Sequence, residues 1–434
     1  MPQTQTPGLV SRQLAVFLLK AVLREKRAFD EAFDASSSNP AFAKLEFRDR
    51  AFARAIAATA LRRLGQIQDL LNRFLKTPLP AKAFEAHFIL VAGAAQLAFM
   101  EVAPHAAIGL AVEQTKSSHP CRPYSGLVNA VLRKINSNAA AIVDQQDAAE
   151  INTPPWLFTR WTKHYGIEIA RKIAAVHLEE PSLDLSVKGD PQFWASRLSG
   201  TVLPWGTVRL SAKGRIEDID GYAEGAWWVQ DAGAALPALL LGDVRGKRIA
   251  DLCAAPGGKT AELAARGADV TAVDISGTRL RRLQENLDRL KLSTKIVHAD
   301  AAEWNATEPF DAVLLDAPCS ATGTIRRNPD IPYLKTQADI DALSAVQTRL
   351  LGHAVNLLKP GGQLVYSTCS LEPEECEAQV ERLLSSRQDI SLAPLKADEL
   401  GIPAEAVTPA GMLRTLPFHM GGMDGFLAAR FVLV

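Results

Sequence analysis

Apolar residues in the first 140 positions recur at the three- and four-residue spacing of helices. The pattern covers 11–34, 47–75, 83–100, 106–116 and 124–136. Ser11 is a candidate N-cap for the first stretch, and Gly65 is a candidate break in the second. Prolines separate the later stretches, and 83–100 is apolar nearly all round, as a buried central helix would be. The pattern predicts an all-α bundle.

From Trp227 onward, short apolar runs alternate with helical stretches. Strands are expected at 247–253, 269–274, 294–300, 310–316, 361–368 and 425–434. Helices are expected at 257–267, 276–291, 336–358 and 372–384. Apolar strands that alternate with helices are typical of a doubly wound, mainly parallel, Rossmann-like sheet. Ligands bind such sheets at the carboxyl ends of the strands.

A segment of weaker pattern lies between these two regions. Residues 136–155 are polar and alanine-rich, which indicates a connector. A helix near 167–179 and short β-like runs at 183–187 and 207–210 then predict a small α+β subdomain. We therefore expect an all-α N-terminal bundle (1–140), a linker with a small α+β subdomain (141–225), and an α/β domain (226–434).

The charge of the chain is unevenly distributed. Its net charge is zero over 434 residues, yet residues 1–140 hold 18 Lys and Arg against 10 Asp and Glu, a net charge of +8. A basic module joined to a near-neutral one indicates nucleic-acid binding, although a solvated basic helical face would look the same. No apolar run is long enough to cross a bilayer, and residues 1–13 lack a signal-peptide pattern, so we expect a cytoplasmic protein.

The loop DLCAAPGGKT (251–260) follows the first strand of the α/β domain and opens a helix. Backbone N–H groups in such a turn can bind an anionic group. A phosphate-binding loop would need glycine at the position of Cys253, and the dinucleotide fingerprint G-x-G-x-x-G is absent. S-adenosylmethionine remains as the ligand class that fits this loop. Its methionine carboxylate can bind the loop amides, while its ribose and adenine need acceptors on later strands.

Acidic residues at strand ends supply those acceptors. Asp274 ends the second strand and suits ribose hydroxyls, and Asp300 ends the third and suits the adenine amino group. Any one of them alone would more simply cap a helix. Together with Asp251 and Asp316 they line one edge of one sheet, which predicts S-adenosylmethionine as the cofactor.

The five cysteines are Cys121, Cys253, Cys319, Cys369 and Cys376. An odd number without a C-x-x-C pair argues against a disulfide framework and a structural zinc site, so we predict no metal. Cys319 and Cys369 each follow a strand at the cofactor edge, where reactive groups are common. Cys121 and Cys376 are interpreted as inert core residues, and Cys253 as a loop residue whose backbone serves the cofactor.

A reactive thiol beside S-adenosylmethionine suits methylation of cytosine at C5. That carbon is too weak a nucleophile to take a methyl group from a sulfonium directly. Addition of a thiolate to C6 makes C5 nucleophilic, and a base must later remove the C5 proton before the enzyme is released by elimination.

Five motifs together resemble the Sun-type (Fmu/RsmB, nucleolar Nop-like) RNA cytosine-C5 methyltransferases. They are DLCAAPGGKT (251–260), VDIS (273–276), AD (299–300), DAPCSATGTIRRNPDI (316–331) and YSTCSLEPEE (366–375). The resemblance extends over 153–434, with WWVQDAGA (227–234) and MDGFLAARF (423–431) at its flanks. The paired Pro-Cys and Thr-Cys motifs are its most specific feature.

This resemblance implies a role for each thiol. Cys369 would attack C6, Cys319 would assist resolution of the covalent adduct, and Asp316 would orient the target base near the cofactor. Lys259 would favour the thiolate electrostatically. The implied cofactor contacts are Cys253, Ala254, Ala255, Pro256, Gly257, Gly258, Lys259, Asp274, Asp300 and Asp316.

The front of the chain resembles the NusB-like RNA-binding domain of the bacterial rRNA members of this family, and 153–225 resembles their small RNA-recognition subdomain. Arg326 and Arg327, beside the Cys319 loop, are candidates to hold the RNA backbone near the target. Candidate phosphate contacts in the bundle are Arg12, Arg24, Lys26, Arg27, Arg48, Arg50, Arg54, Arg62 and Arg63.

We therefore expect a monomeric S-adenosylmethionine-dependent methyltransferase that acts on C5 of a cytosine in small-subunit (16S) rRNA, with RNA as its partner and no membrane. The same chemistry on tRNA is an alternative. A second is a non-catalytic, antitermination-like RNA-binding factor, against which the intact Cys319, Cys369 and Asp316 argue. A third, a small-molecule or protein methyltransferase, would not need two reactive thiols and a basic helical module.

Overall fold

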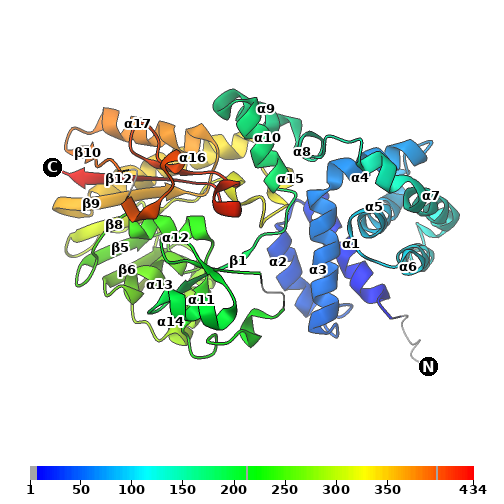
Figure 1. Cartoon of the computed structure of the whole chain (residues 1–434), viewed down its shortest axis with the longest axis horizontal. Coiled ribbons are helices and arrows are strands. Elements are labelled where there is room, and N and C mark those ends of the chain that lie inside the picture. Colours follow the sequence, from blue (N-terminus) through cyan, green and yellow to red (C-terminus); the bar gives the residue numbers. More distant parts are fainter. Residues whose placement is uncertain (1–6, 212–213, 397–398) are drawn as a thin grey trace. The chain divides into compact units, whose positions relative to one another are not determined.

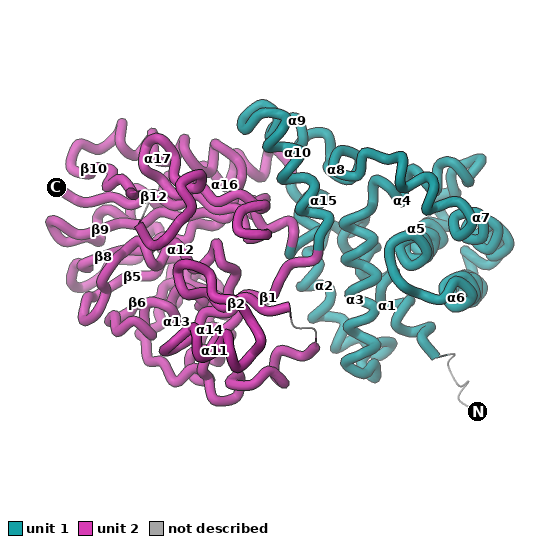
Figure 2. The backbone as a smooth tube through the Cα atoms, in the orientation of Figure 1, with its two compact units in different colours: residues 1–179, 327–335 teal, residues 180–326, 336–434 magenta. Residues whose placement is uncertain are grey.

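The computed structural model describes residues 7–211, 214–396 and 399–434. The chain forms two compact units, one of residues 1–179 with 327–335 and one of residues 180–326 with 336–434 (Figure 2). These units do not follow the three predicted segments, because the segment 141–225 is divided between them. Residues 1–6, part of the 1–13 stretch that lacks a signal-peptide pattern, lie outside the described residues.

The first unit is helical (Figure 1), which confirms the predicted all-α region. Its helices are α1 (Leu9–Leu23), α2 (Phe29–Ala35), α3 (Phe47–Arg62), α4 (Leu64–Phe74), α5 (Phe84–Phe99), α6 (Pro104–Ser117), α7 (Ser125–Val143), α8 (Ala148–Ile151), α9 (Pro155–Tyr165), α10 (Ile167–Val176) and α15 (Ile331–Leu334). Side chains at helical spacing, such as Leu14 and Leu18 of α1, are fully buried in one core with Ile56, Leu90 and Leu132. Burial of this apolar face holds the helices together.

Two predicted helix signals have other roles in this unit. Ser11 is not an N-cap, because α1 begins after Gly8, whose φ of 78° suits glycine. The Ser11 hydroxyl instead donates a hydrogen bond to Asp49, at 3.1 Å. The break in the second stretch falls at Arg63 rather than at Gly65.

The predicted connector at 136–155 is largely helical and packs on the bundle. A Cβ atom at Gly65 would lie 1.7 Å from the carbonyl oxygen of Ile151, so glycine allows the two backbones to meet. The Asn152 side chain accepts from the backbone N–H of Gln66 at 3.0 Å and donates to its side-chain oxygen at 2.9 Å. These contacts join 141–155 to the helical unit.

A short segment that follows the Cys319 loop in sequence also belongs to the helical unit (Figure 2). Within 327–335, the buried Asp330 carboxylate accepts from the backbone N–H of Phe29 at 2.8 Å, and the Tyr333 hydroxyl donates to the Leu61 carbonyl at 2.8 Å. Lys26 donates to the Tyr333 carbonyl at 3.0 Å. The helices therefore hold a segment that the sequence assigns to the α/β domain.

The second unit contains a small antiparallel sheet with the strand order β2-β3-β1-β4. Its strands are β1 (Leu183–Val187), β2 (Thr201–Val202), β3 (Val208–Leu210) and β4 (Trp227–Val229), with helix α11 (Pro191–Leu198) between the first two. Asp184 and Arg209 form a bidentate ion pair, with both N–O distances 2.7 Å. The α+β character predicted for this region is thus present.

The larger sheet has the strand order β10-β12-β9-β8-β5-β6-β7, with β11 paired to β12. The strands are β5 (Arg248–Leu252), β6 (Asp269–Asp274), β7 (Lys295–His298), β8 (Phe310–Asp316), β9 (Leu358–Thr368), β10 (Ile390–Leu392), β11 (Leu413–Thr415) and β12 (Phe426–Leu433). Strands β5 to β9 are parallel and β12 is antiparallel to β9, which confirms the predicted Rossmann-like fold. The helices of this region are α12 (Ala232–Leu239), α13 (Gly258–Ala265), α14 (Gly277–Leu290), α16 (Gln337–Val355) and α17 (Glu377–Ser386). Across the described ranges, no helix combines the length and apolar character that a bilayer crossing requires.

Candidate active site

The strand order reverses between β5 and β8, which are parallel neighbours with aligned ends. Leu252 pairs with Leu315, so the loops after both strands leave the same edge of the sheet. In an open α/β sheet this switch point forms the ligand-binding crevice. The loop after β5 contains Gly257, which lies just before α13 and has a φ of 102°. A Cβ atom at Gly257 would lie 2.9 Å from the Leu283 side chain, so both conformation and space favour glycine.

The acidic residues at the strand ends have distinct environments. Asp274 accepts from the backbone N–H groups of Ala255 and Ser276 at 3.1 and 2.8 Å, which ties the cofactor loop to the end of β6. Asp300 accepts from Ala302 N–H and lies 3.3 Å from the Arg349 guanidinium. By contrast Asp251 is fully buried and accepts from the Thr260 hydroxyl, so it holds the first turn of α13 to the end of β5. Burial raises the pKa of Asp251 to about 7.

Lys259 and Asp316 form an ion pair at the switch point. The ammonium of Lys259 lies 2.8 Å from the Asp316 carboxylate, which also accepts from the Ser367 hydroxyl at 3.0 Å. Burial alone would lower the pKa of Lys259, but the charge and hydrogen bond of Asp316 outweigh it and raise that pKa. The pair therefore fixes a positive charge on the first turn of α13, beside the end of β8.

Glu262, one turn further along α13, is a buried carboxyl group whose pKa burial raises to about 8 from a usual 4.5. Because the folded protein holds this proton more tightly, the stabilising contribution is complete below about pH 4.5 and is lost as the pH rises toward 8. The free energy of unfolding of the wild type should therefore fall between pH 5 and pH 8.5. We expect Glu262→Gln to reduce that fall by on the order of a few kcal/mol. Urea unfolding at pH 5 and pH 8.5 measures it; equal pH dependence in both proteins would contradict the expectation.

The sulfur atoms of Cys319 and Cys369 lie 3.4 Å apart, although the residues are 50 positions apart in sequence. The hydrogen bond with Cys369, and then burial, raise the pKa of Cys319 well above its usual value. Cys319 therefore keeps its proton at neutral pH. The geometry brings together the two thiols that the sequence analysis selected.

The other cysteines differ from this pair. Cys121 and Cys376 are fully buried, and burial raises the pKa of Cys376 to about 12. Cys253 lies in the cofactor loop, where burial strongly raises its pKa. These environments are those of unreactive thiols.

Backbone hydrogen bonds join the two loops that carry Cys319 and Cys369. The N–H of Ala317 donates to the Ser367 carbonyl at 2.9 Å, and the N–H of Gly323 donates to the Cys369 carbonyl at 3.0 Å. A Cβ atom at Gly323 would lie 2.0 Å from the Gly425 carbonyl oxygen, so no side chain fits there. Glu375 bonds to both of these loops and was not predicted from the sequence. The acidic run after the Thr-Cys motif is the only sequence signal for it.

The structure overturns two of the predicted RNA contacts. The Arg326 side chain is 2% exposed and lies 3.9 Å from the buried Asp231 carboxylate, so it supports the fold. Arg12 is also buried, and its guanidinium donates to the Gly8 carbonyl at 2.9 Å. Arg327 and Arg48 remain exposed.

Several other basic candidates interact within the helical unit. Arg54 pairs with Asp30 at 2.6 Å, and Arg50 donates to the Phe33 carbonyl at 3.1 Å. The Arg24 guanidinium stacks 3.9 Å from the centre of the Phe84 ring. Part of the positive charge counted in the sequence thus stabilises the bundle.

Comparison with known proteins agrees with this arrangement. The family model described as 16S rRNA methyltransferase RsmB/F matches residues 238–432, and that of the NusB family matches residues 9–137. Ribosomal RNA small subunit methyltransferase B of Salmonella paratyphi B is 35% identical over 408 residues, which cover 90% of this chain and 92% of that protein. The chain belongs to this rRNA methyltransferase family. It is therefore an S-adenosylmethionine-dependent methyltransferase with a NusB-like helical region.

Solved structures share the fold of this RsmB/F family member. A methyltransferase homolog protein from Pyrococcus horikoshii is 28% identical, with a TM-score of 0.54, over 65% of this chain and all of that one. The crystal structure of PH0851 matches 99% of both chains with a TM-score of 0.76 and 22% identity. The chemistry of the groups at the switch point fits S-adenosylmethionine. A loop that opens a helix can bind a carboxylate, and carboxylates such as those of Asp274 and Asp300 can accept from ribose hydroxyls and from an adenine amino group.

Proposed function

We propose that this RsmB/F family member methylates C5 of a cytosine in small-subunit (16S) rRNA. In this proposal, Cys369 adds to C6 of the base and Cys319 assists release of the covalent adduct. The cofactor contacts are those expected from the sequence: the loop from Cys253 to Lys259, with Asp274, Asp300 and Asp316. When bound, S-adenosylmethionine supplies an electrophilic methyl group.

The proposed reaction follows from the chemistry of the ring. The Cys369 thiolate forms a bond to C6, and the displaced electron pair makes C5 nucleophilic toward the methyl group. A base then takes the proton from C5. The electrons of the C5–H bond restore the double bond as the C6–S bond breaks, which returns Cys369 as a thiolate.

The observation that carries this proposal is the 3.4 Å separation of two thiols in the loops that follow β8 and β9. A methyltransferase that acts on a stronger nucleophile has no use for either sulfur. Lys259 and Asp316 support the same assignment, because their ion pair lies at the carboxyl edge of the sheet that carries both thiols. In this proposal Asp316 orients the target base beside the cofactor.

The substrate is tested in cells and in solution. Bisulfite sequencing of 16S rRNA and tRNA from a strain that lacks this protein should show one unmethylated cytosine in 16S rRNA, restored by the wild-type gene. Loss of a tRNA mark alone would overturn the rRNA assignment. Cell fractionation and size-exclusion chromatography test the accompanying predictions of a cytoplasmic location and a monomer.

We expect the helical unit to bind the RNA backbone through its exposed basic side chains. Lys44, Arg48, Lys116 and Lys134 are exposed there. Replacing all four by glutamine should weaken RNA affinity and reduce the slope of log affinity against log salt by up to about 3. Filter binding between 50 and 300 mM salt, as a rough working range, measures this slope.

Charge substitution is preferable to deletion in this test, because removing the helices would expose the 327–335 segment that packs among them. Lys247→Gln, Arg248→Gln and Lys359→Gln together form the control, since these residues lie at the amino ends of β5 and β9, opposite the site. Equal salt slopes in the two variants would contradict RNA binding by the helical unit.

A further inference from the structure

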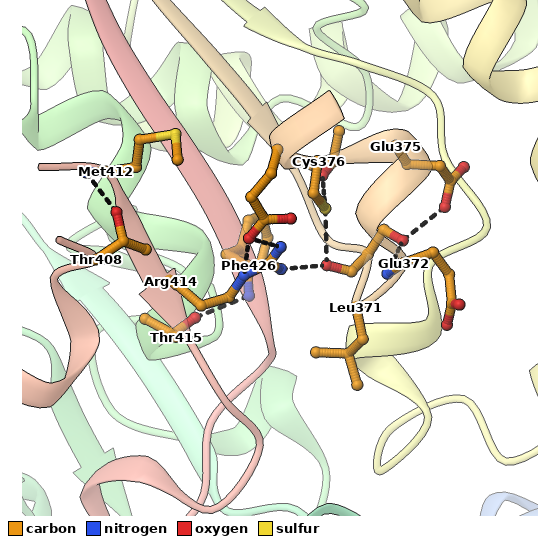
Figure 3. A network of polar contacts seen from close by, with 12 residues as sticks. Leu371, Glu372, Glu375, Cys376, Thr408, Met412, Arg414, Thr415 and Phe426 are labelled. Carbon is orange, nitrogen blue, oxygen red and sulfur yellow. Dashed lines mark hydrogen bonds and ion pairs between the residues drawn. The ribbon is translucent and has the colours of Figure 1, made fainter. Parts of the chain in front are cut away.

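Glu375 joins the two thiol-bearing loops through a single buried carboxylate. It lies in the 3₁₀ turn Pro373–Glu375 (Figure 3). Its side chain is fully buried. Its Oε2 atom accepts from the hydroxyl groups of both Ser320 and Ser370, the latter at 2.5 Å. Its Oε1 atom accepts from the backbone N–H of Ser320 at 2.8 Å.

The two serines directly follow the two cysteines in sequence. Ser320 follows Cys319, and Ser370 follows Cys369, so each loop is held one residue away from its sulfur. The serine hydroxyls also lie 3.2 Å from each other. One carboxylate therefore links both loops next to the point where their thiols face each other.

A second layer of contacts holds the same groups. The Gln347 side chain, from α16, donates to Glu375 Oε1 at 3.1 Å and to the Pro318 carbonyl at 2.9 Å. Arg414 donates to the Ser370 carbonyl at 2.9 Å and pairs with Glu377 at 2.6 Å (Figure 3). Hydrogen bonds to a buried charged acceptor are stronger than neutral ones, and losing one partner leaves the others unsatisfied.

We propose that Glu375 is a positioning residue that holds Cys319 and Cys369 at the separation their chemistry requires. The inference rests on the proposed function of the two thiols. The hydrogen bonds of Glu375 reach Ser320 and Ser370, the neighbours of the two cysteines, so we infer that it acts through these serines. A shift of about 1 Å in a reacting group can lower a rate on the order of a hundredfold.

Two variants of Glu375 separate hydrogen bonding from space filling. Glu375→Met keeps the approximate volume but accepts none of the bonds. Glu375→Gln can still accept from the Ser320 N–H and the Gln347 amide, while its own NH₂ group donates to the two hydroxyls. We expect Glu375→Met to lower kcat on the order of a hundredfold and Glu375→Gln by less than about tenfold, with KM for RNA unchanged.

Glu262→Met is the matched control, because Glu262 is a buried carboxyl group in the same unit that accepts from Gln230 rather than from either loop. Its turnover should stay near that of the wild type. Equal losses in Glu375→Met and Glu375→Gln, or none in either, would overturn the role of the hydrogen bonds.

Thiol spacing is also measured without the methyl-transfer reaction. Phenylarsine oxide forms two As–S bonds with a close pair of thiols and releases water. Reduced wild-type protein and Glu375→Gln should each bind one phenylarsine oxide per chain, and replacing Cys319 should abolish this binding. Glu375→Met should not bind it. Capture by Glu375→Met equal to wild type would overturn the inference, whatever the outcome for the proposed reaction.

If Glu375→Met does not fold, as judged by circular dichroism, Ser370 provides the same test. Ser370→Ala removes one hydroxyl from the carboxylate, whereas Ser370→Thr retains it. We expect Ser370→Ala to lower both turnover and arsenical capture and Ser370→Thr to preserve them. Indistinguishable alanine and threonine variants would contradict the positioning role.

Discussion

Cys369→Ala is expected to lower methyl transfer to 16S rRNA by at least about a thousandfold, because C5 of cytosine then has no activating nucleophile. S-adenosylmethionine affinity should be unchanged, since the loop from Cys253 to Lys259 and the carboxylate of Asp274 are untouched. Transfer of a radioactive methyl group to RNA measures the first effect, and isothermal titration calorimetry measures the second.

The control for this prediction is Cys121→Ala, which removes a buried thiol from the helical unit. Its turnover should match the wild type. A Cys369→Ala protein that keeps more than about a tenth of wild-type turnover would rule out the nucleophile, because loss of a nucleophile normally costs far more. Loss of cofactor affinity in the same variant would instead indicate a disturbed fold.

Cys319→Ala is expected to accumulate a covalent protein–RNA adduct. The raised pKa of Cys319 keeps its proton in place, 3.4 Å from the sulfur that must leave C6. A thiol that donates a hydrogen bond to the departing thiolate stabilises it, so alanine at this position should slow elimination while leaving the addition step intact. Denaturing gel electrophoresis of the reaction mixture should show a slow, RNase-sensitive band.

The double variant Cys319→Ala with Cys369→Ala is the matched control, because it should form no such band. Methylated RNA released from Cys319→Ala at the wild-type rate, with no band, would remove the resolving role from Cys319. A band in the double variant would show that another group forms the adduct.

The local pattern of the sequence predicted most strands and helices of the larger sheet and the glycine-containing loop that follows β5. Strand β8 was predicted at its observed bounds, 310–316, because a short apolar run between polar flanks has few alternatives. Helix α13, Gly258–Ala265, was predicted at 257–267 from the alternation of strands and helices, and the structure adds that Gly257 before it is left-handed. The alternation of such strands and helices then determined the parallel sheet and its ligand-binding edge.

Local pattern failed where an element depends on a distant partner. The polar run at 136–155 resembled a linker, yet Asn152 binds Gln66 and orders it on the bundle. Arg326 resembled an exposed RNA contact, but the fold buries it near Asp231. The 327–335 segment looked like part of the α/β domain, while Asp330 and Tyr333 bind helices near the start of the chain.

The sequence by itself predicted which residues carry the proposed chemistry, because Cys319 and Cys369 each follow a strand at the same edge of a predicted sheet. Only the tertiary structure decided that their sulfur atoms lie 3.4 Å apart and that Glu375 joins their loops. Spacing along the chain cannot give that distance, because it results from the pairing of β8 with β9 and from hydrogen bonds between residues about 50 positions apart.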